Sequence, residues 1–253
     1  TARENLDHLI DDDSFLEFGQ FAVAAQRSRR DYEELQDKTN ADGIITGFCS
    51  INSKLVGEYE AKAAAIVYDY SVLAGTQGYF HHAKLDRICE QANKFNLPII
   101  IFTEGGGGRP GDIDVLTQIA GLHIPSFSSW AQLTGQCLKI AVNNGYCFAG
   151  NAVLFGCSDF KIATKHSWIG MAGPAMIEGG GLGSFEPTDI GPIEVQEKNG
   201  VVDYVAENEE EATNIAKQLL SYFQGSLEEF TVADQEQLRE MMPADRRYTY
   251  EVR

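Results

Sequence analysis

The chain has 253 residues, of which 43% are hydrophobic and 23% are charged, and 37 acidic against 20 basic residues give a formal net charge of −17. This apolar content supports a folded core in one large domain or two small ones, so a disordered, collagen-like or disulfide mini-scaffold chain is excluded. The acidic charge argues against a nucleic-acid partner, because phosphate contacts need a basic surface. No apolar run approaches the roughly 18 residues of a membrane span. The N-terminus shows no signal-peptide pattern.

The cysteines are odd in number and show no Cys-x-x-Cys spacing. We interpret them as small buried thiols in a reducing compartment, which predicts a cytoplasmic location or another reduced one. They are Cys49, Cys89, Cys137, Cys147 and Cys157.

The first half of the chain alternates short apolar runs with turn signals. The opening segment predicts two short helical or irregular pieces, with Asp11-Asp12-Asp13-Ser14 ending the first and capping the second. Residues 43–48 and 65–70 predict strands, with a turn at 53–54 between them. Helical spacing then predicts a helix from about 82 to 95, and Pro98 opens a buried strand over 99–102.

The second half repeats the order of strand, Gly-rich loop and helix. This order predicts a layered α/β fold with its site at the strand ends. The predicted elements are strands over 138–142, 160–163 and 201–205, glycine-rich loops over 144–150 and 170–174, a helix capped by Asn208, and a charged tail over 226–253.

Four consecutive glycines, Gly105 to Gly108, follow the apolar strand at 99–102. Each glycine costs about 0.5–1 kcal/mol relative to alanine in ordered backbone. A tight turn under close packing is one interpretation. We favour the other, in which backbone N–H groups face a ligand with no Cβ in the way.

The glycines at 105–108 match neither of two nucleotide-binding motifs in full. Gly106, Gly108 and Gly111 satisfy Gly-x-Gly-x-x-Gly, but no acidic residue for a ribose lies about 20 residues further on. No Gly-Lys-Ser/Thr follows, which excludes a P-loop. Neither motif is therefore favoured.

Residues 140–150, followed by 157–163, resemble the crotonase superfamily segment that stabilises thioester enolates. A closer resemblance is to the N-terminal half of the carboxyltransferase of biotin-dependent acyl-CoA carboxylases. It covers roughly residues 5–225 and is carried by 75–78, 104–112, 173–174 and 199–212. The resemblance implies an α/β, crotonase-like (ClpP/crotonase) layered fold of repeated ββα units. It implies one domain over 1–253, with 226–253 a peripheral tail or linker, and the second carboxyltransferase half absent.

The resemblance also implies a reaction. Two backbone N–H groups, one from Gly107 or Gly108 and one from Gly150, would hold the thioester oxygen of an acyl-CoA as an enolate. The α-carbon would then attack CO2 released from carboxybiotin on a partner domain. The implied catalytic residues are Gly107, Gly108 and Gly150; the implied substrate-binding residues are Arg27, Arg29, Arg30, Gly75, Gly78, Gly106 and Ala149; no metal is implied.

The partners implied are the biotin carboxyl carrier and biotin carboxylase domains, the C-terminal carboxyltransferase half, and further copies in a homo-oligomer. Biotin is the implied cofactor and acyl-CoA the substrate. The position of the catalytic glutamate of hydratases holds Val153, so a hydratase is not expected. Two alternatives stay open: a stand-alone crotonase-type acyl-CoA hydrolase or decarboxylase, and a non-catalytic assembly domain of a carboxylase complex.

Several charged and aromatic residues have two interpretations each. Arg27, Arg29 and Arg30 would bind the CoA phosphates, or form a surface cluster balanced by neighbouring acids. Arg109 would orient the loop or pair with Asp112. The other assignments are His81 and His82 as caps or surface residues, and Tyr146 and Phe148 packing the loop or lining an acyl pocket.

Overall fold

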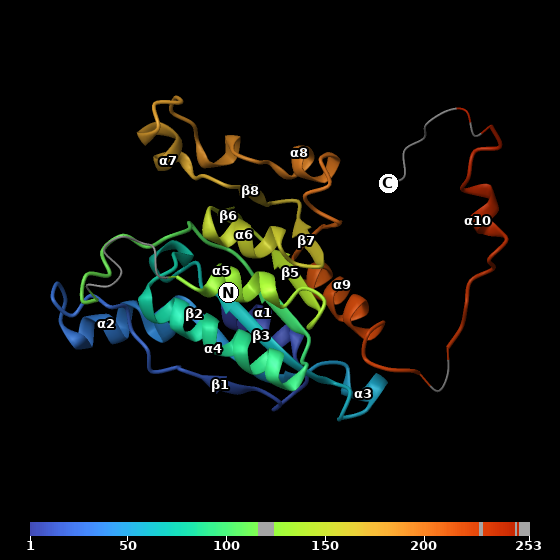
Figure 1. Cartoon of the computed structure of the whole chain (residues 1–253), viewed down its shortest axis with the longest axis horizontal. Helices are drawn as coiled ribbons and strands as arrows, with labels where there is room; N and C mark the ends of the chain where they lie inside the picture. The colour runs from blue at the N-terminus through green and yellow to red at the C-terminus, as the bar shows by residue number, and fades with distance from the viewer. Residues whose placement is uncertain (116–123, 228–229, 246, 248–253) are drawn as a thin grey trace.

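Nine strands form two sheets in the part of the chain that the computed structural model describes, residues 1–115, 124–227, 230–245 and 247. The seven-stranded sheet has the order β1-β2-β3-β4-β5-β7-β9, and β6 and β8 form a smaller sheet beside it (Figure 1). The strands are β1 (Leu16–Phe18), β2 (Ile44–Ser50), β3 (Lys62–Tyr68), β4 (Ile99–Phe102), β5 (Lys139–Asn143), β6 (Tyr146–Phe148), β7 (Phe160–Thr164), β8 (Trp168–Gly170) and β9 (Tyr204–Ala206).

The large sheet is mostly parallel. β1, β2 and β3 pair antiparallel, whereas β3, β4, β5, β7 and β9 run parallel. Ile99 of β4, for example, lies opposite Ala64 on one side and Lys139 on the other. Because the strands are parallel, the loops that follow Tyr68, Phe102 and Asn143 leave from one edge of the sheet.

Helices cover both faces of this sheet (Figure 1). α4 (Tyr79–Phe95) and α5 (Ser126–Gln132) lie on one face, and α1 (Ala2–Leu9) and α9 (Glu209–Ser221) lie on the other. The other helices are α2 (Tyr32–Lys38), α3 (Ser53–Val56), α6 (Gly150–Gly156), α7 (Pro174–Gly179), α8 (Ile193–Lys198) and α10 (Gln237–Glu240), with short 3₁₀ turns η1 (Asn40–Gly43), η2 (Leu73–Gly75) and η4 (Pro187–Asp189).

Burial on two faces explains the apolar strand sequences. In β3, Ala64 and Ile66 face the α4 side, and Ala65 and Val67 face the α1–α9 side. A strand covered on both faces reads as a continuous apolar run rather than an alternating one. The layered α/β fold predicted from the sequence is therefore confirmed.

Some local predictions were wrong. Residues 16–18 form a strand, β1, rather than a helical or irregular piece, because pairing with β2 overrides their local pattern. The predicted turn at 53–54 lies in the short helix α3, and α4 begins three residues earlier than predicted, at Tyr79. The glycine-rich loop predicted over 144–150 contains β6, which pairs with β8, and β8 ends at the first residue of the loop predicted over 170–174.

The segment after Gly225 carries α10 and runs away from the sheet (Figure 1). Residues 228–229, 246 and 248–253 of the predicted tail lie outside the described residues. None of the described helices is long and apolar enough to cross a membrane.

Candidate active site

The four glycines Gly105–Gly108, here called the glycine loop, lie at the carboxyl edge of the parallel strands. The Gly105 N–H donates to the Tyr146 carbonyl at 2.7 Å, and the Phe148 N–H donates to the Gly105 carbonyl at 2.9 Å. On its other side the loop bonds to the segment before α4, where the Gly106 N–H donates to the Ala74 carbonyl at 3.0 Å. The loop is thus fixed between β6 and residues 74–78.

Gly108 lies in a short parallel bridge with Gln77. The Gln77 N–H donates to the Gly107 carbonyl at 2.7 Å, and the Arg109 N–H donates to the Gln77 carbonyl at 2.9 Å. In such a bridge the amide of Gly108 itself points away from Gln77. A Cβ on Gly108 would meet no atom within 4 Å, so this position is open.

Unlike Gly108, Gly107 has a bonded N–H and is closely packed. Its N–H donates to the side-chain oxygen of Asn151 at 3.0 Å. Its φ is +89°, and a Cβ would lie 2.6 Å from the Cβ of Ala149. Close packing therefore explains why position 107 is a glycine, in agreement with the interpretation of the four glycines as a tight turn. Within the described residues, Gly108 is the one position from 105 to 109 whose N–H has no acceptor.

Gly150 begins α6 at the same edge of the sheet. The residue before it, Ala149, has φ 51° and ψ −118°, a conformation that a non-glycine residue rarely adopts. Strained backbone of this kind is concentrated at functional sites. The Ala149 N–H donates to the Gly170 carbonyl at 3.0 Å, whereas the Gly150 N–H has no acceptor among the described residues.

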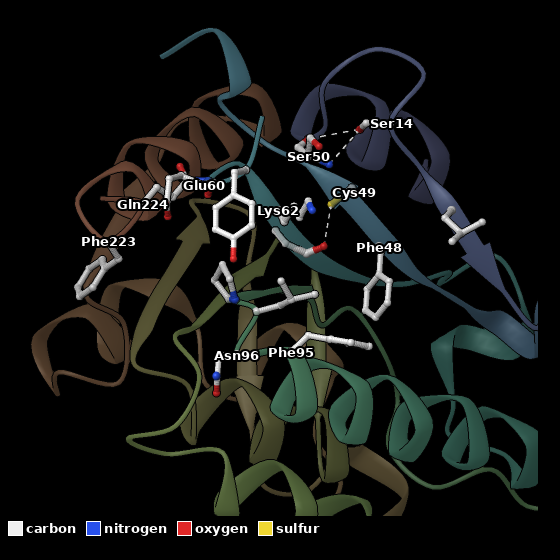
Figure 2. A pocket seen from close by; sticks show the side chains of 15 residues that line it. Ser14, Phe48, Cys49, Ser50, Glu60, Lys62, Phe95, Asn96, Phe223 and Gln224 are labelled. Carbon is white, nitrogen blue, oxygen red and sulfur yellow. Dashed lines mark hydrogen bonds between the residues drawn. The ribbon is translucent and has the colours of Figure 1, made fainter. Parts of the chain in front are cut away.

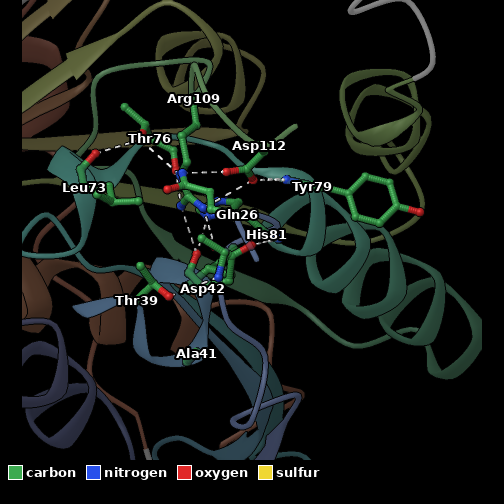
Figure 3. A network of polar contacts seen from close by, with 12 residues as sticks. Gln26, Thr39, Ala41, Asp42, Leu73, Thr76, Tyr79, His81, Arg109 and Asp112 are labelled. Carbon is green, nitrogen blue, oxygen red and sulfur yellow. Dashed lines mark hydrogen bonds and ion pairs between the residues drawn. The ribbon is translucent and has the colours of Figure 1, made fainter. Parts of the chain in front are cut away.

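A buried polar network holds the end of the glycine loop (Figure 3). Arg109 pairs with Asp42, and these side chains are 2% and 0% exposed. Arg109 also donates to the Thr76 carbonyl at 2.7 Å and lies 3.6 Å from Asp112. Asp112 in turn accepts from the Tyr79 N–H and from Gln26, each at 2.9 Å. Arg109 thus orients the loop, and its main partner is Asp42 rather than Asp112.

The two histidines at the start of α4 are buried, so their assignment as caps or surface residues was wrong. His81 is 0% exposed, and its N–H donates to Asp42 at 2.7 Å. His82 Nδ1 lies 2.9 Å from the Ser126 hydroxyl. Burial lowers the pKa of His81 well below its usual value and that of His82 to about 4, so both rings are neutral.

The glycines before α4 also serve close packing. A Cβ on Gly75 would lie 2.8 Å from the Cα of Gly105, and one on Gly78 would lie 2.7 Å from the Arg109 Cζ. On Gly106 a Cβ would lie 3.3 Å from the Thr76 methyl group. Gly75, Gly78 and Gly106 were all predicted as substrate-binding. They lie in or against the glycine loop, and the absence of a side chain there lets nearby backbone and side-chain atoms pack closely.

The arginine cluster lies beside residues 111–114, which follow the glycine loop. Arg30 forms an ion pair with Glu34 at 2.7 Å, as the surface interpretation predicted. The exposed Arg27 guanidinium lies over the Tyr32 ring, 4.6 Å from its centroid. Arg29 is exposed, and its Nη1 lies 3.5 Å from the Gly111 carbonyl oxygen.

An aromatic cluster packs around the loop. The Tyr146 ring stacks on Phe148 with centroids 5.7 Å apart and lies 4.9 Å from the Trp168 ring. Phe148 is almost fully buried, at 5% exposure. These contacts fit the prediction that both residues pack the loop.

Sequence reasoning missed Glu104, which immediately precedes the glycine loop. Its carboxylate accepts the Asn144 N–H at 2.8 Å, and burial raises its pKa to about 7. The sequence did contain an indication of this role, because Glu104 is an acidic residue directly before four consecutive glycines. Asn151 was also missed, since nothing in its sequence position indicates a bond to a residue 44 positions away.

A cavity of about 710 Å³ lies at the opposite edge of the sheet, where β3 and β4 begin (Figure 2). Phe48, Phe95 and Phe223 line it, together with Lys62 and Cys49. Burial raises the pKa of the Cys49 thiol to about 12, so this thiol is no nucleophile at neutral pH. The described residues hold no group of three His, Cys, Asp or Glu side chains suited to a metal ion. The glycine loop is therefore the better candidate site.

Several known proteins are similar to this chain. The 12S subunit of methylmalonyl-CoA carboxyltransferase from Propionibacterium freudenreichii subsp. shermanii is 30% identical over 100% of this chain and 48% of its own length. The propionyl-CoA carboxylase beta chain of Saccharopolyspora erythraea is 27% identical over 88% of this chain and 39% of its own length. The chain thus spans about half the length, or less, of these two relatives.

Two solved structures are also similar to this chain. A single-chain, multi-domain long-chain acyl-CoA carboxylase is 50% identical with a TM-score of 0.89, over 100% of this chain and 25% of its own. A transcarboxylase 12S structure, with methylmalonyl-CoA and methylmalonic acid bound, is 28% identical with a TM-score of 0.74, over 100% of this chain and 48% of its own. These neighbours confirm the crotonase-like fold. Residues 1–253 match the family described as the carboxyl transferase domain, and the chain belongs to that family.

Proposed function

We propose that this domain binds an acyl-CoA and holds its thioester oxygen, as an enolate, between the N–H groups of Gly108 and Gly150. One observation carries the proposal: Gly108 alone among residues 105–109 has an N–H without an acceptor within the described residues. An open position at the carboxyl edge of parallel strands is where a ligand of an α/β protein is expected. The names of the relatives supply the substrate class, an acyl-CoA.

Main-chain N–H donors suit the stabilisation of a thioester enolate. Loss of the α-proton places negative charge on the thioester oxygen, and preorganised N–H groups at that oxygen stabilise the charge by several kcal/mol. Gly108 leaves room for the thioester, because no atom lies within 4 Å of where its Cβ would be. Carboxybiotin on a partner domain would release CO2, and the ring nitrogen freed on biotin would take up the α-proton. The α-carbon would then bond to the carbon of CO2 while the N–H groups of the two glycines hold the thioester oxygen.

The chain covers about half of its relatives or less, so turnover is expected only with the second carboxyltransferase half. We place the CoA phosphates near Arg27 and Arg29. Both are exposed and contact the segment after the glycine loop, Arg29 at the Gly111 carbonyl and Arg27 through its main-chain N–H at Asp114, whereas Arg30 is bound to Glu34. Biotin carrier and biotin carboxylase domains and a homo-oligomer complete the proposed assembly.

The test compares two valine variants. Gly108→Val fills the open position beside the proposed oxyanion, whereas Gly156→Val adds the same side chain at an equally open position at the end of α6. Calorimetric titration of the chain with acetyl-CoA, a longer acyl-CoA, free CoA and NAD measures binding. Carboxyl transfer is measured in the complete carboxylase that contains the domain.

We expect Gly108→Val to lower kcat by about 100-fold or more, because the added side chain fills the space of the thioester and keeps its oxygen away from the N–H donors, and Gly156→Val to leave kcat unchanged. Acyl-CoA should bind, and NAD should not. Full carboxyl transfer by a folded Gly108→Val enzyme would contradict the enolate site. Equal loss in both variants would contradict it as well.

A further inference from the structure

A buried glutamine, Gln77, contacts both glycines of the proposed site. It lies between η2 and α4 and is 4% exposed. Its main chain forms one hydrogen bond to the residue before Gly108 and one to the residue after it. These two bonds fix both peptide groups that flank Gly108, and they therefore fix the direction of the Gly108 N–H.

The side chain of Gln77 reaches Gly150. A Cβ built on Gly150 would overlap the Gln77 Oε1 and lie 3.1 Å from its Cδ, so the carboxamide lies directly against this glycine. At its other end, Nε2 donates to the Tyr68 hydroxyl at 2.9 Å. Tyr68 is itself fixed, because it is 2% exposed and its ring packs against His81 at 4.5 Å. The carboxamide is thus held between the end of β3 and the start of α6.

We infer that Gln77 is a positioning residue, which holds Gly108 with its main chain and Gly150 with its side chain so that both N–H groups face one oxygen. The inference rests on the proposed function. Gly108 and Gly150 come from separate loops, and Gln77 contacts both of them. It acts through the two glycines and not on the substrate itself.

The substitution Gln77→Glu tests this role because it keeps size and shape and replaces the amide by a carboxylate. A negative charge beside Gly150 would oppose the charge that develops on the thioester oxygen. The groups that pack around the Gln77 carboxamide keep one charge state near neutral pH, because burial raises the pKa of Tyr68 and lowers those of His81 and His82. Glu104, directly before the glycine loop, has a pKa of about 7 and titrates in the wild-type enzyme as well. The recovery of Gln77→Glu is therefore measured relative to the pH profile of the wild type.

In the complete carboxylase at about pH 8, we expect Gln77→Glu to lower kcat about 100-fold, with KM for acyl-CoA changed less than about threefold. Lowering the pH toward about 6 should restore part of the lost activity, because a protonated glutamate is neutral. Gln77→Met, which removes the amide without adding charge, should lower kcat about tenfold and show no such recovery.

Gln224→Glu is the matched control, because Gln224 is 3% exposed and lies at the opposite edge of the sheet. It should leave kcat and the pH profile unchanged. If Gln77→Glu behaves like Gln224→Glu while Gly108→Val is inactive, the positioning role is wrong and the proposed function stands. If Gly108→Val is fully active, the proposed function itself fails.

Discussion

The guanidinium of Arg109 and the carboxylate of Asp42 form an ion pair with almost no solvent contact, although the two residues are 67 positions apart in the chain. Asp42 lies just before β2 with φ 52°, and Arg109 immediately follows the glycine loop. Burial raises the pKa of Asp42, and the charge of Arg109 opposes that rise. The ion pair therefore connects the residue after the glycine loop to the turn before β2.

Arg109→Met should destabilise the domain by about 3–5 kcal/mol, because it leaves a buried carboxylate without its partner. The double variant Arg109→Met/Asp42→Leu should recover part of this loss, since neither charge remains buried. Urea unfolding of the wild-type chain, both single variants and the double variant measures the coupling. A loss below about 1 kcal/mol for Arg109→Met would place the pair among weak surface contacts.

Gly107→Ala should destabilise the domain by roughly 1–3 kcal/mol. Its φ of +89° disfavours any side chain, and the new Cβ would meet the Cβ of Ala149 at 2.6 Å. Gly108→Ala is the neighbouring control and should change stability by less than about 0.5 kcal/mol, because its position is open. Thermal unfolding checks both variants, and equal losses would refute the packing explanation.

Glu104 should make stability depend on pH. Its pKa is about 7 in the folded chain against an ordinary value of 4.5, so the folded state keeps a proton that the unfolded state releases between these values. The stabilisation is complete below about pH 4.5 and is lost as the pH rises to about 7, a change of up to about 3 kcal/mol.

Glu104→Gln removes this titration and keeps an oxygen that accepts the Asn144 N–H. The free energy of unfolding of the variant, relative to wild type, should therefore rise with pH across the same range. Denaturant melts at several pH values provide the measurement, with the exposed Glu210→Gln as control. Parallel curves for wild type and Glu104→Gln would show that Glu104 does not titrate there.

One thiol should react with an alkylating reagent in the folded chain and five in denaturant. Cys157 is exposed, whereas the other four cysteines are buried. Burial also raises the pKa of Cys89 to about 12, which removes its thiolate at neutral pH. Mass spectrometry after brief labelling counts the reacted thiols, and Cys157→Ser should react at none. Rapid labelling of Cys147 would contradict the packing of β6.

Much of the sheet could be predicted from the sequence. The strands at 99–102 and 160–163 are found within a residue of their predicted ends, because burial on both faces leaves an uninterrupted apolar run. The short strands β1, β6 and β8 were missed. Each has three residues, and partners far along the chain rather than its own pattern determine it.

The site was only partly predictable. The glycine loop and Gly150 stand out as sequence motifs, but the choice between Gly107 and Gly108 depends on Asn151, whose side chain takes up one of the two N–H groups. The burial of His81 follows from the left-handed turn that brings Asp42 to it. Such contacts between distant segments leave no periodic signal in a single sequence.

The seven-stranded sheet ends on β1 and β9, and each of these strands has three residues. A short outer strand offers few free N–H and C=O groups, so it is a poor template for another strand to join. We therefore expect copies of this domain to associate through helices and loops rather than by extending the sheet from chain to chain. The same feature should protect the domain from edge-to-edge aggregation at high concentration.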